Sequence, residues 1–348
     1  MRICLVGTLP DAGQEIHKGP ERTTIGLAES LQRRGHKVRV IADEGTPEAV
    51  GTDARVINVE SPPGVARLVE FAWRAREVIN PNEYDAVHTW RSIFGADIIS
   101  LHSVGMAEQV EKKLPGTFSK RFLWGAKIER FAKLLTSSRA KRTIVTAAKN
   151  AADAKRFGFD VDEVIPVGVN ESFLQPDKSG SGTEVFCLGR IEPRKQQHFV
   201  VTETPSKYSL RLAGPRSDEA YAQRIPNFDS YWDGTLSPAE LEQAYQTASV
   251  FVLPSVFEGF GLTAVEAMAA GTPVVVADTC GVADLVEEHD LGIVYRFNDS
   301  KSYQTALETV FAKRDTYAAR AKSFVETNLL WDHIAESYEE VYESVSRE

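Results

Sequence analysis

Residues 249–277 constrain the fold more than any other stretch, because they read as a strand, a loop, a helix and a second strand in succession. Residues 250–253 are β-branched and aromatic, which is typical of a buried parallel strand. Residues 262–270 are good helix formers, Gly271 predicts the end of that helix, and residues 274–276 restart a strand. Ligands bind at the carboxyl ends of strands in open parallel sheets, so the loop after the first strand is a candidate site.

The chemistry of this loop is specific. Gly259 and Gly261 let the backbone pass close to a ligand, and the helix that begins near Gly261 adds unpaired amides suited to a phosphate. Glu258 precedes these amides, and Glu266 lies about a turn and a half inside the helix. One carboxylate can face the reacting end of a ligand while the other accepts hydrogen bonds from hydroxyl groups. A glycine-rich helix start with two ordinary glutamates is the simpler interpretation of the motif taken alone.

Length and charge favour two domains. A chain of 348 residues is too long for one doubly wound domain and comfortable for two. The formal charge of −9 argues against a general nucleic-acid binder. Residues 1–170 hold 25 Lys and Arg against 21 Asp and Glu, whereas residues 171–348 hold 15 against 28. Halves of such different charge are easier to explain as separate domains.

The sequence predicts a cytoplasmic protein. Met1 and Arg2 lead straight into a strand rather than a secretory signal, and no stretch approaches the ~18 apolar residues of a membrane span. Cys4, Cys187 and Cys280 are an odd number without metal-ligand spacing, which favours small buried thiols in a reducing compartment.

Strands and helices alternate along both halves, which predicts a parallel, doubly wound sheet in each. In the first half we expect strands at residues 2–7, 37–42, 54–59, 84–88, 97–102, 142–146 and 164–167, and helices at 21–34, 65–79 and within 118–135. In the second half we expect strands at 185–188, 209–213, 250–253, 274–276 and 292–295, and helices between the first two strands and at 238–247, 262–270, 302–312, 316–327 and 332–345. The predicted domains are residues 1–170 and 171–331, with a hinge at 170–183 and the final helix, about 332–348, packing back onto the first domain.

The loops after the first strand of each half do not support hydride chemistry. A nicotinamide dehydrogenase needs G-x-G-x-x-G there, and neither loop has it. The second half instead offers Arg190 and Lys195 in the run that begins at Gly189. A bidentate guanidinium and an ammonium beside a helix start suit a diphosphate, although a solvated basic loop explains an isolated pair equally simply.

These motifs together resemble the paired-glutamate signature of the family 4 retaining glycosyltransferases. The resemblance rests on Pro254-Ser255, Glu258-Gly259-Phe260-Gly261-Leu262, Glu266-Ala267-Met268-Ala269, Gly271-Thr272-Pro273-Val274 and Gly189-Arg190…Lys195. It implies the GT-B fold, in which two Rossmann-like, doubly wound parallel-sheet domains face each other with a cleft between them. The sequence departs from the pattern at Cys280-Gly281, at Asp284 and at residues 167–170, positions that bear on the donor sugar more than on the reaction.

The resemblance also implies roles for these residues. Glu258 would lie near the donor sugar and the reacting carbon, Arg190 and Lys195 would hold the diphosphate, and Glu266 would bind the ribose. The remaining implied donor-site residues are Ser255, Gly259, Phe260, Gly261, Leu262, Thr263 and Gly214. The resemblance implies a reaction that needs no metal ion or other cofactor. In that reaction the leaving phosphate helps to deprotonate the incoming hydroxyl group on the same face of the sugar. A UDP-sugar is the expected donor.

The first half should bind the acceptor. Residues 18–22, with Gly19, Glu21 and Arg22, resemble the family's Gly-Gly…Glu-Arg loop, although a proline-led helix start with an acidic first turn explains them as well. His102 ends a predicted strand and resembles a family histidine that contacts the sugar or acceptor, with Ser103 as the alternative for that position. His88 and Arg91 are weaker candidates.

Residues 112–142 carry ten Lys and Arg and one acidic residue, Glu129. Within them an apolar stripe recurs at helical spacing, with basic residues off it, which predicts a core-facing stripe and a solvated basic face. The stripe is Trp124, Ile128, Phe131 and Leu135, and the basic residues are Lys120, Lys127 and Arg130. The alternative is a surface that docks on anionic lipid at the inner face of a membrane.

The predicted function is transfer of a sugar from a nucleotide diphosphate to a hydroxyl group of a growing glycan or lipid-linked glycan, with the anomeric configuration retained. Two alternatives stay open. A nucleotide-sugar epimerase could share the architecture, but it would need further acid and base groups in the first half. A catalytically silent nucleotide-sugar binding protein would lose some of Glu258, Glu266, Arg190 and Lys195, and all four are present.

Overall fold

The computed structural model describes residues 1–11, 19–47, 51, 53–62, 64–137, 140–174 and 182–346. The chain forms two compact units. Unit 1 comprises Met1–Glu111, Phe118–Gly168 and Trp331–Glu348, and unit 2 comprises Lys112–Thr117 and Val169–Leu330. Most of the predicted hinge (residues 175–181) and Lys18 of the predicted acceptor loop lie outside the described residues.

Unit 1 contains a parallel sheet in the order β3-β2-β1-β4-β5-β6-β7. The order reverses between β1 and β4, so the carboxyl ends of these two strands lie at the topological switch point where ligands bind. The strands are β1 (Arg2–Gly7), β2 (Lys37–Ala42), β3 (Asp53–Val56), β4 (Ala86–Thr89), β5 (Ile98–Leu101), β6 (Arg142–Val145) and β7 (Glu163–Val164). The apolar residues of β1, β4 and β5 are buried, as their β-branched sequences predict.

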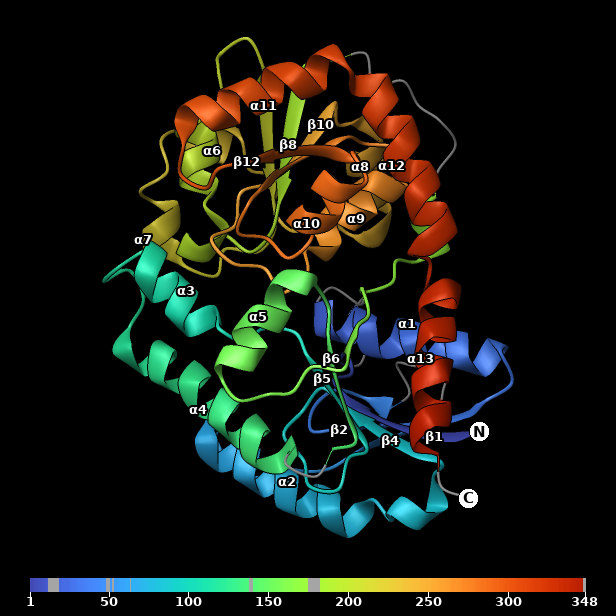
Figure 1. The fold of residues 1–348 in the computed structure, drawn as a ribbon. Helices are drawn as coiled ribbons and strands as arrows, with labels where there is room; N and C mark the ends of the chain where they lie inside the picture. Colours follow the sequence, from blue (N-terminus) through green and yellow to red (C-terminus); the bar gives the residue numbers. More distant parts are fainter. Residues whose placement is uncertain are drawn as a thin grey trace. The chain divides into compact units, whose positions relative to one another are not determined.

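The helices of unit 1 surround this sheet (Figure 1), and the last helix of the chain is one of them. Helix α13 (Trp331–Val345) packs against α1 (Gly19–Arg33), where Glu339 accepts hydrogen bonds from Arg34 at 2.8 and 2.7 Å. His88 on β4 lies between Tyr342 and Ser100, at 2.8 and 2.7 Å, and burial lowers its pKa to about 3. His88 therefore joins α13 to the sheet as a neutral core residue. The other helices are α2 (Val65–Val78), α3 (Met106–Lys113), α4 (Lys120–Ser137), α5 (Ala148–Arg156) and the short η2 (Pro81–Glu83).

Helix α4 is oriented differently from the prediction. Trp124, Phe131 and Leu135 are exposed rather than core-facing, with 65%, 59% and 54% of each residue accessible. Two of the three basic side chains, those of Lys127 and Arg130, lie toward α3, whereas Lys120 is exposed. Lys127 pairs with Glu111 at 3.0 Å and Arg130 pairs with Glu108 at 2.6 Å. The prediction of a core stripe with a solvated basic face was wrong, because these three stripe residues are exposed while Lys127 and Arg130 pair with glutamates of α3.

Unit 2 contains a five-stranded parallel sheet in the order β12-β11-β10-β8-β9. Its order reverses between β8 and β10, which creates a second topological switch point. The strands are β8 (Glu184–Leu188), β9 (Ser209–Ala213), β10 (Val250–Leu253), β11 (Val274–Ala277) and β12 (Gly292–Tyr295). The helices are α6 (Gln197–Glu203), α7 (Glu219–Ala222), α8 (Pro238–Thr247), α9 (Leu262–Ala269), α10 (Ala283–Glu288), α11 (Ser300–Ala312) and α12 (Arg314–Asn328), with short turns at η3 (Glu171–Phe173), η4 (Pro193–Lys195) and η5 (Phe228–Ser230).

Local sequence explains why the two helices nearest the switch point start where they do. Helix α8 begins with a capping box between Ser237 and Glu240 and has Pro238 in its first turn. Helix α9 begins at Leu262, directly after Gly261, whose φ of 116° is costly for other residues. Its alanines pack closely, and Ala264, Val265, Ala267, Met268 and Ala269 are fully buried. In both units, none of the described helices is long and apolar enough to cross a membrane.

Candidate functional site

Two loops meet at the switch point of unit 2. The loop at residues 189–195 follows β8, and the loop at residues 254–261 follows β10. Gly214, which follows β9, lies against the first of these loops: a Cβ atom placed on Gly214 would lie 2.2 Å from the carbonyl oxygen of Gly189. Gly214 also has a φ of 126°, so only glycine fits this position comfortably. The structure therefore brings Arg190, Lys195, Gly214 and Glu258 to one edge of one sheet.

Glu258 is the most strongly anchored side chain at this edge. Its Oε1 accepts hydrogen bonds from the ammonium of Lys195 and, at 2.8 Å, from the hydroxyl of Ser255. Arg194 lies 3.6 Å from the same oxygen. Burial acts to raise the pKa of Glu258, but the charges of Lys195 and Arg194 and the hydrogen bonds outweigh it and lower the pKa to about 2. Glu258 is therefore a fixed carboxylate anion at neutral pH.

The cations around Glu258 differ in how firmly they are bound. Arg194 is largely buried and donates to Glu192 at 2.7 Å and to the carbonyl oxygen of Phe257 at 3.1 Å. Arg190 is 56% exposed and contacts Glu192 only at 3.4 Å, which leaves its guanidinium accessible to a ligand. Sequence reasoning did not single out Arg194, although it lies directly between the motif positions of Glu192 and Lys195. Its role as a second anchor of the 189–195 loop depends on contacts 63 residues away.

The turn at residues 280–282 holds the glycine loop in place. The amide of Gly281 donates to the carbonyl oxygen of Glu258 at 3.0 Å, and the amide of Val282 donates to that of Phe260 at 2.6 Å. A Cβ atom on Gly281 would lie 2.3 Å from the carbonyl oxygen of Gly259, so the two backbones touch directly. The backbone at residues 259–263 thus reaches the start of α9 in a fixed path, and α9 has no side-chain cap on its first amides.

Glu266 lies inside α9 and is almost fully buried. Its Oε2 accepts a hydrogen bond from the hydroxyl of Tyr245 at 2.9 Å. The Tyr245 ring contacts Phe173, Phe186 and Phe251 edge-on, at centroid distances of 5.6–5.9 Å. Aromatic packing therefore fixes the tyrosine that orients Glu266. Of the other predicted donor residues, Ser255 and Phe260 are buried and Leu262 and Thr263 are half-buried at the start of α9.

The predicted acceptor residues lie in unit 1. Gly19, Glu21 and Arg22 form the first turn of α1, where Glu21 is buried and Arg22 is half-buried. His102 and Ser103 follow β5, and Ser103 is exposed. The His102 ring lies edge-to-face on Trp90 at a centroid distance of 6.4 Å, and its buried Nε2 has no hydrogen-bond partner. Burial, followed by the charge of Lys133, lowers the pKa of His102 to about 3, so the imidazole is neutral at physiological pH.

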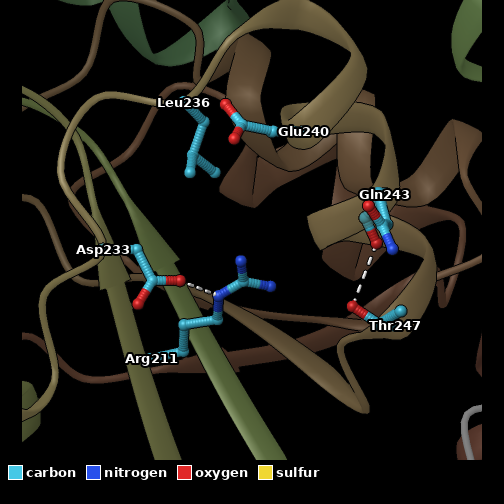
Figure 2. A pocket seen from close by; sticks show the side chains of 6 residues that line it. All are labelled: Arg211, Asp233, Leu236, Glu240, Gln243 and Thr247. Carbon is cyan, nitrogen blue, oxygen red and sulfur yellow. Dashed lines mark hydrogen bonds and ion pairs between the residues drawn. The ribbon is translucent and has the colours of Figure 1, made fainter.

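A hollow of about 390 Å³ lies elsewhere in unit 2, between β9 and α8. Figure 2 shows Arg211 and Asp233 paired on one side and Glu240 and Gln243 on the other. None of the predicted donor residues lines this hollow.

Among the residues that the structure describes, no group of three or more His, Cys, Asp or Glu could hold a metal ion.

Two family models match the chain. The model described as "Glycosyltransferase Family 4" matches residues 17–173, and the model described as "Glycosyl transferases group 1" matches residues 170–324. A glycosyltransferase of Methanocaldococcus jannaschii is 34% identical over 91% of this chain and 92% of that protein. The phosphatidyl-myo-inositol mannosyltransferase of Mycobacterium leprae is 26% identical over 98% of this chain and 97% of that protein.

Solved structures give the same fold. Sucrose-phosphate synthase from Thermosynechococcus elongatus matches with a TM-score of 0.78 at 21% identity, covering 99% of this chain and 98% of that chain. Anabaena HepE, solved in complex with UDP-glucose, matches with a TM-score of 0.75 at 17% identity, covering 99% and 100%. Because the family matches span residues 17–324 and the archaeal relative exceeds 30% identity across nine-tenths of the chain, this protein is a glycosyltransferase of family 4 with the GT-B fold.

Proposed function

We propose that this glycosyltransferase moves a sugar from a UDP-sugar to a hydroxyl group of a glycan or lipid-linked glycan, retaining the anomeric configuration and using no metal ion. The observation that carries the proposal is the Glu258 carboxylate, which Lys195, Arg194 and Ser255 anchor at the switch point of unit 2, at the start of the loop that leads into α9. Anchored charges and unpaired helix amides are the groups that a sugar diphosphate needs. The UDP-glucose complex of HepE, which shares this fold, supports a UDP-sugar as the donor.

The donor diphosphate would contact Arg190 and Lys195. Arg190 is largely exposed and can reach a phosphate, and Lys195 has further N–H donors beyond the one that it gives to Glu258. As the sugar leaves, negative charge grows on the diphosphate, so these cations stabilise the transition state more than the bound donor. Glu266 would bind the ribose hydroxyl groups, in the orientation that Tyr245 gives it.

The pKa of Glu258 favours an electrostatic role over general-base catalysis. A carboxylate with a pKa of about 2 is a weak base and gives little driving force for proton abstraction near pH 7. Glu258 would instead orient the sugar hydroxyl groups and stabilise positive charge that develops at the reacting carbon. The leaving phosphate would then take the proton of the incoming hydroxyl group, on the same face of the sugar, which retains the configuration.

Unit 1 would bind the acceptor, with His102 as a neutral hydrogen-bonding partner for a hydroxyl group. A membrane-associated acceptor agrees with the exposed apolar surface of this unit. Helix α4 packs against α2, and Trp124 and Phe131 on α4 and Val69 and Trp73 on α2 are all more than half exposed. We propose that this α2–α4 surface, with exposed Lys120 at one end, docks on the cytoplasmic face of an anionic membrane. The mycobacterial relative is named for a lipid acceptor, which supports this proposal.

A donor panel tests the proposed reaction. Thermal denaturation is followed with UDP-, GDP- and ADP-sugars, and the stabilising donor is then incubated with the enzyme alone. A transferase slowly hydrolyses the donor, an epimerase isomerises it, and a silent binding protein leaves it unchanged. Stabilisation by a UDP-sugar followed by slow hydrolysis supports the proposal, and isomerisation or an unchanged donor contradicts it.

A further inference from the structure

Buried polar atoms without hydrogen-bond partners gather at the carboxyl ends of β2, β4 and β5 in unit 1. Within the described residues, nine buried side-chain nitrogen and oxygen atoms have no partner, and five of them lie at these strand ends. Each unpaired buried group costs free energy, so native proteins rarely collect such groups in one place without a use. The five atoms are Asp43 Oδ1, Trp90 Nε1, Arg91 Nε, Ser92 Oγ and His102 Nε2.

Asp43 and Arg91 lie on the two sides of the switch point in this sheet. Asp43 follows β2 and Arg91 follows β4, and both strands are direct neighbours of β1. The amide of Arg91 donates to the hydroxyl of Thr89 at 2.9 Å, which fixes the turn after β4. The location is therefore one where an open parallel sheet binds a ligand, and the backbone there is already organised.

Two arginines share the single carboxylate of Asp43. Arg91 donates to Oδ2 at 2.5 Å, and Arg67 on α2 lies 3.3 Å from the same oxygen while donating to the Asp43 carbonyl oxygen at 2.5 Å. The Asp43 side chain is 1% exposed, whereas those of Arg67 and Arg91 are 23% and 24% exposed. Part of each arginine side chain thus reaches the surface, although Arg91 Nε is buried, and this Asp43 cluster (Asp43, Arg67 and Arg91) carries one more positive than negative charge.

A purely structural ion pair does not account for this arrangement. A closed network would satisfy both carboxylate oxygens, but Asp43 Oδ1 and Arg91 Nε stay unpaired. The chemistry of these two atoms indicates which ligand groups would satisfy their hydrogen bonding. Asp43 Oδ1 needs a hydrogen-bond donor such as a hydroxyl group, and the guanidinium edges fit the paired oxygens of a phosphate.

We propose that the acceptor carries a phosphate group, that Arg67 and Arg91 bind this phosphate, and that Asp43 accepts a hydrogen bond from an adjacent acceptor hydroxyl group. Trp90 and His102 then border the same subsite and offer their unpaired nitrogens to the remaining hydroxyl groups. The inference rests on the proposed transferase function and specifies its acceptor. The phosphate is either a monoester on a soluble polyol or the diester of a lipid headgroup.

Binding and transfer experiments test this separately from the donor chemistry. Inorganic phosphate, glucose and glucose 6-phosphate are titrated calorimetrically into the wild-type enzyme and into Arg67→Gln and Arg91→Gln. Binding of glucose 6-phosphate should weaken at least about tenfold in either variant, because each loses a charge-assisted contact to the phosphate. Arg55→Gln is the matched control, since Arg55 on the neighbouring strand β3 is exposed and lies outside the cluster. Equal binding of glucose and glucose 6-phosphate, or unchanged binding in both variants, overturns the inference.

Transfer assays then distinguish the two sources of phosphate. Glucose 6-phosphate against glucose tests a monoester, and detergent-dispersed phosphatidylglycerol against a neutral diacylglycerol tests a diester. Faster transfer to either phosphorylated member of a pair supports the inference, and equal transfer within both pairs contradicts it. Arg67→Lys and Arg91→Lys keep the positive charge but lose the planar, bidentate guanidinium group. Stronger phosphate binding by these variants than by the Gln variants would exclude misfolding as the cause of the loss. If the wild-type enzyme binds and hydrolyses a UDP-sugar but ignores phosphate on the acceptor, this inference fails while the proposed function stands.

Discussion

The ammonium of Lys195 donates a hydrogen bond to Oε1 of Glu258, which joins the loop after β8 to the loop after β10. The pair is largely buried, with 12% of the lysine and 15% of the glutamate side chain exposed. Each residue therefore prepares the other: the lysine keeps the glutamate ionised, and the glutamate holds the lysine at the switch point where the diphosphate is expected.

Lys195→Ala should weaken donor binding. The variant removes a charge-assisted hydrogen bond to the diphosphate, so the donor dissociation constant should rise about 10- to 100-fold. Isothermal titration with the stabilising UDP-sugar measures this. Lys207→Ala, which removes an exposed lysine of the same unit that pairs with Glu308, is the control and should bind like the wild type. Equal affinities in the two variants would remove Lys195 from the donor site.

Glu258→Gln should lower turnover and change the pH dependence of stability. The loss of an anchored charge at the reacting carbon should reduce kcat by roughly 100-fold, with a small change in donor affinity. The pKa of Glu258 is about 2 against an ordinary value of 4.5, so its ion pair stabilises the folded protein fully above about pH 4.5. That stabilisation, on the order of 3 kcal/mol, disappears as the pH falls from 4.5 to 2.

The measurement is the thermal denaturation midpoint of both proteins between pH 7 and pH 3. The wild type should melt well above Glu258→Gln at pH 7, and the difference should shrink below pH 4.5. A difference that stays constant with pH would show that the carboxylate does not titrate as described.

Tyr245→Phe should weaken donor binding, although Tyr245 acts through Glu266 rather than by contacting the donor. The tyrosine hydroxyl group orients the buried carboxylate of Glu266, and its loss leaves that oxygen without this donor. We expect KM for the donor to rise about three- to tenfold with kcat nearly unchanged, since a buried hydrogen bond contributes roughly 1 kcal/mol. Tyr303→Phe is the control, because its hydroxyl group pairs with Thr204 away from the switch point. Similar kinetics in both variants would limit Tyr245 to a packing role.

His102 should stay neutral throughout the physiological range. Its pKa of about 3 predicts that its ring-proton resonance does not shift between pH 8 and pH 5, whereas an ordinary histidine titrates near 6.5. The resonance is assigned by its absence from the spectrum of His102→Gln. Lys133→Gln removes the nearby charge and should raise the pKa of His102. A wild-type transition near pH 6.5 would mean that His102 is solvated and can carry a proton.

The sequence predicted the strands better than the side-chain contacts. β9, β10 and β12 have the predicted bounds. β10 and β12 contain β-branched residues and adjoin Pro or begin with Gly, which leaves little choice of structure, and β9 ends directly before Gly214. β7 is two residues long where four were predicted, and α3, α5, α7 and α10 were not predicted. α5 and α10 are short, and only two residues of each are buried, so periodicity identifies such helices poorly.

The contacts that organise the candidate sites were beyond prediction for a different reason. Lys195 and Glu258 each belong to a motif, but Tyr245, Arg194 and Asp43 act through partners that only the folded chain brings near. Helix α4 illustrates the limit most plainly. Its periodicity correctly indicates two unlike faces, yet it cannot say which one packs inward. In the folded chain Arg130 and Lys127 pair with Glu108 and Glu111 on α3, partners that the periodicity of α4 does not contain.

The exposed aromatic residues of α4 provide the last prediction. If the α2–α4 surface docks on a membrane, Trp124→Glu and Phe131→Glu should each reduce co-sedimentation with anionic phosphatidylglycerol vesicles at low salt by about fivefold or more, because a buried aromatic side chain contributes roughly 1.5–3 kcal/mol. Phe94→Glu makes the same change at another exposed aromatic residue, outside both helices, and should bind like the wild type. Raising the salt concentration should weaken the binding of all three variants, because salt screens the attraction between Lys120 and Arg121 and the anionic lipid. If the wild type does not bind anionic vesicles at low salt, or if Phe94→Glu weakens binding as much as Trp124→Glu, this surface serves another purpose than membrane docking.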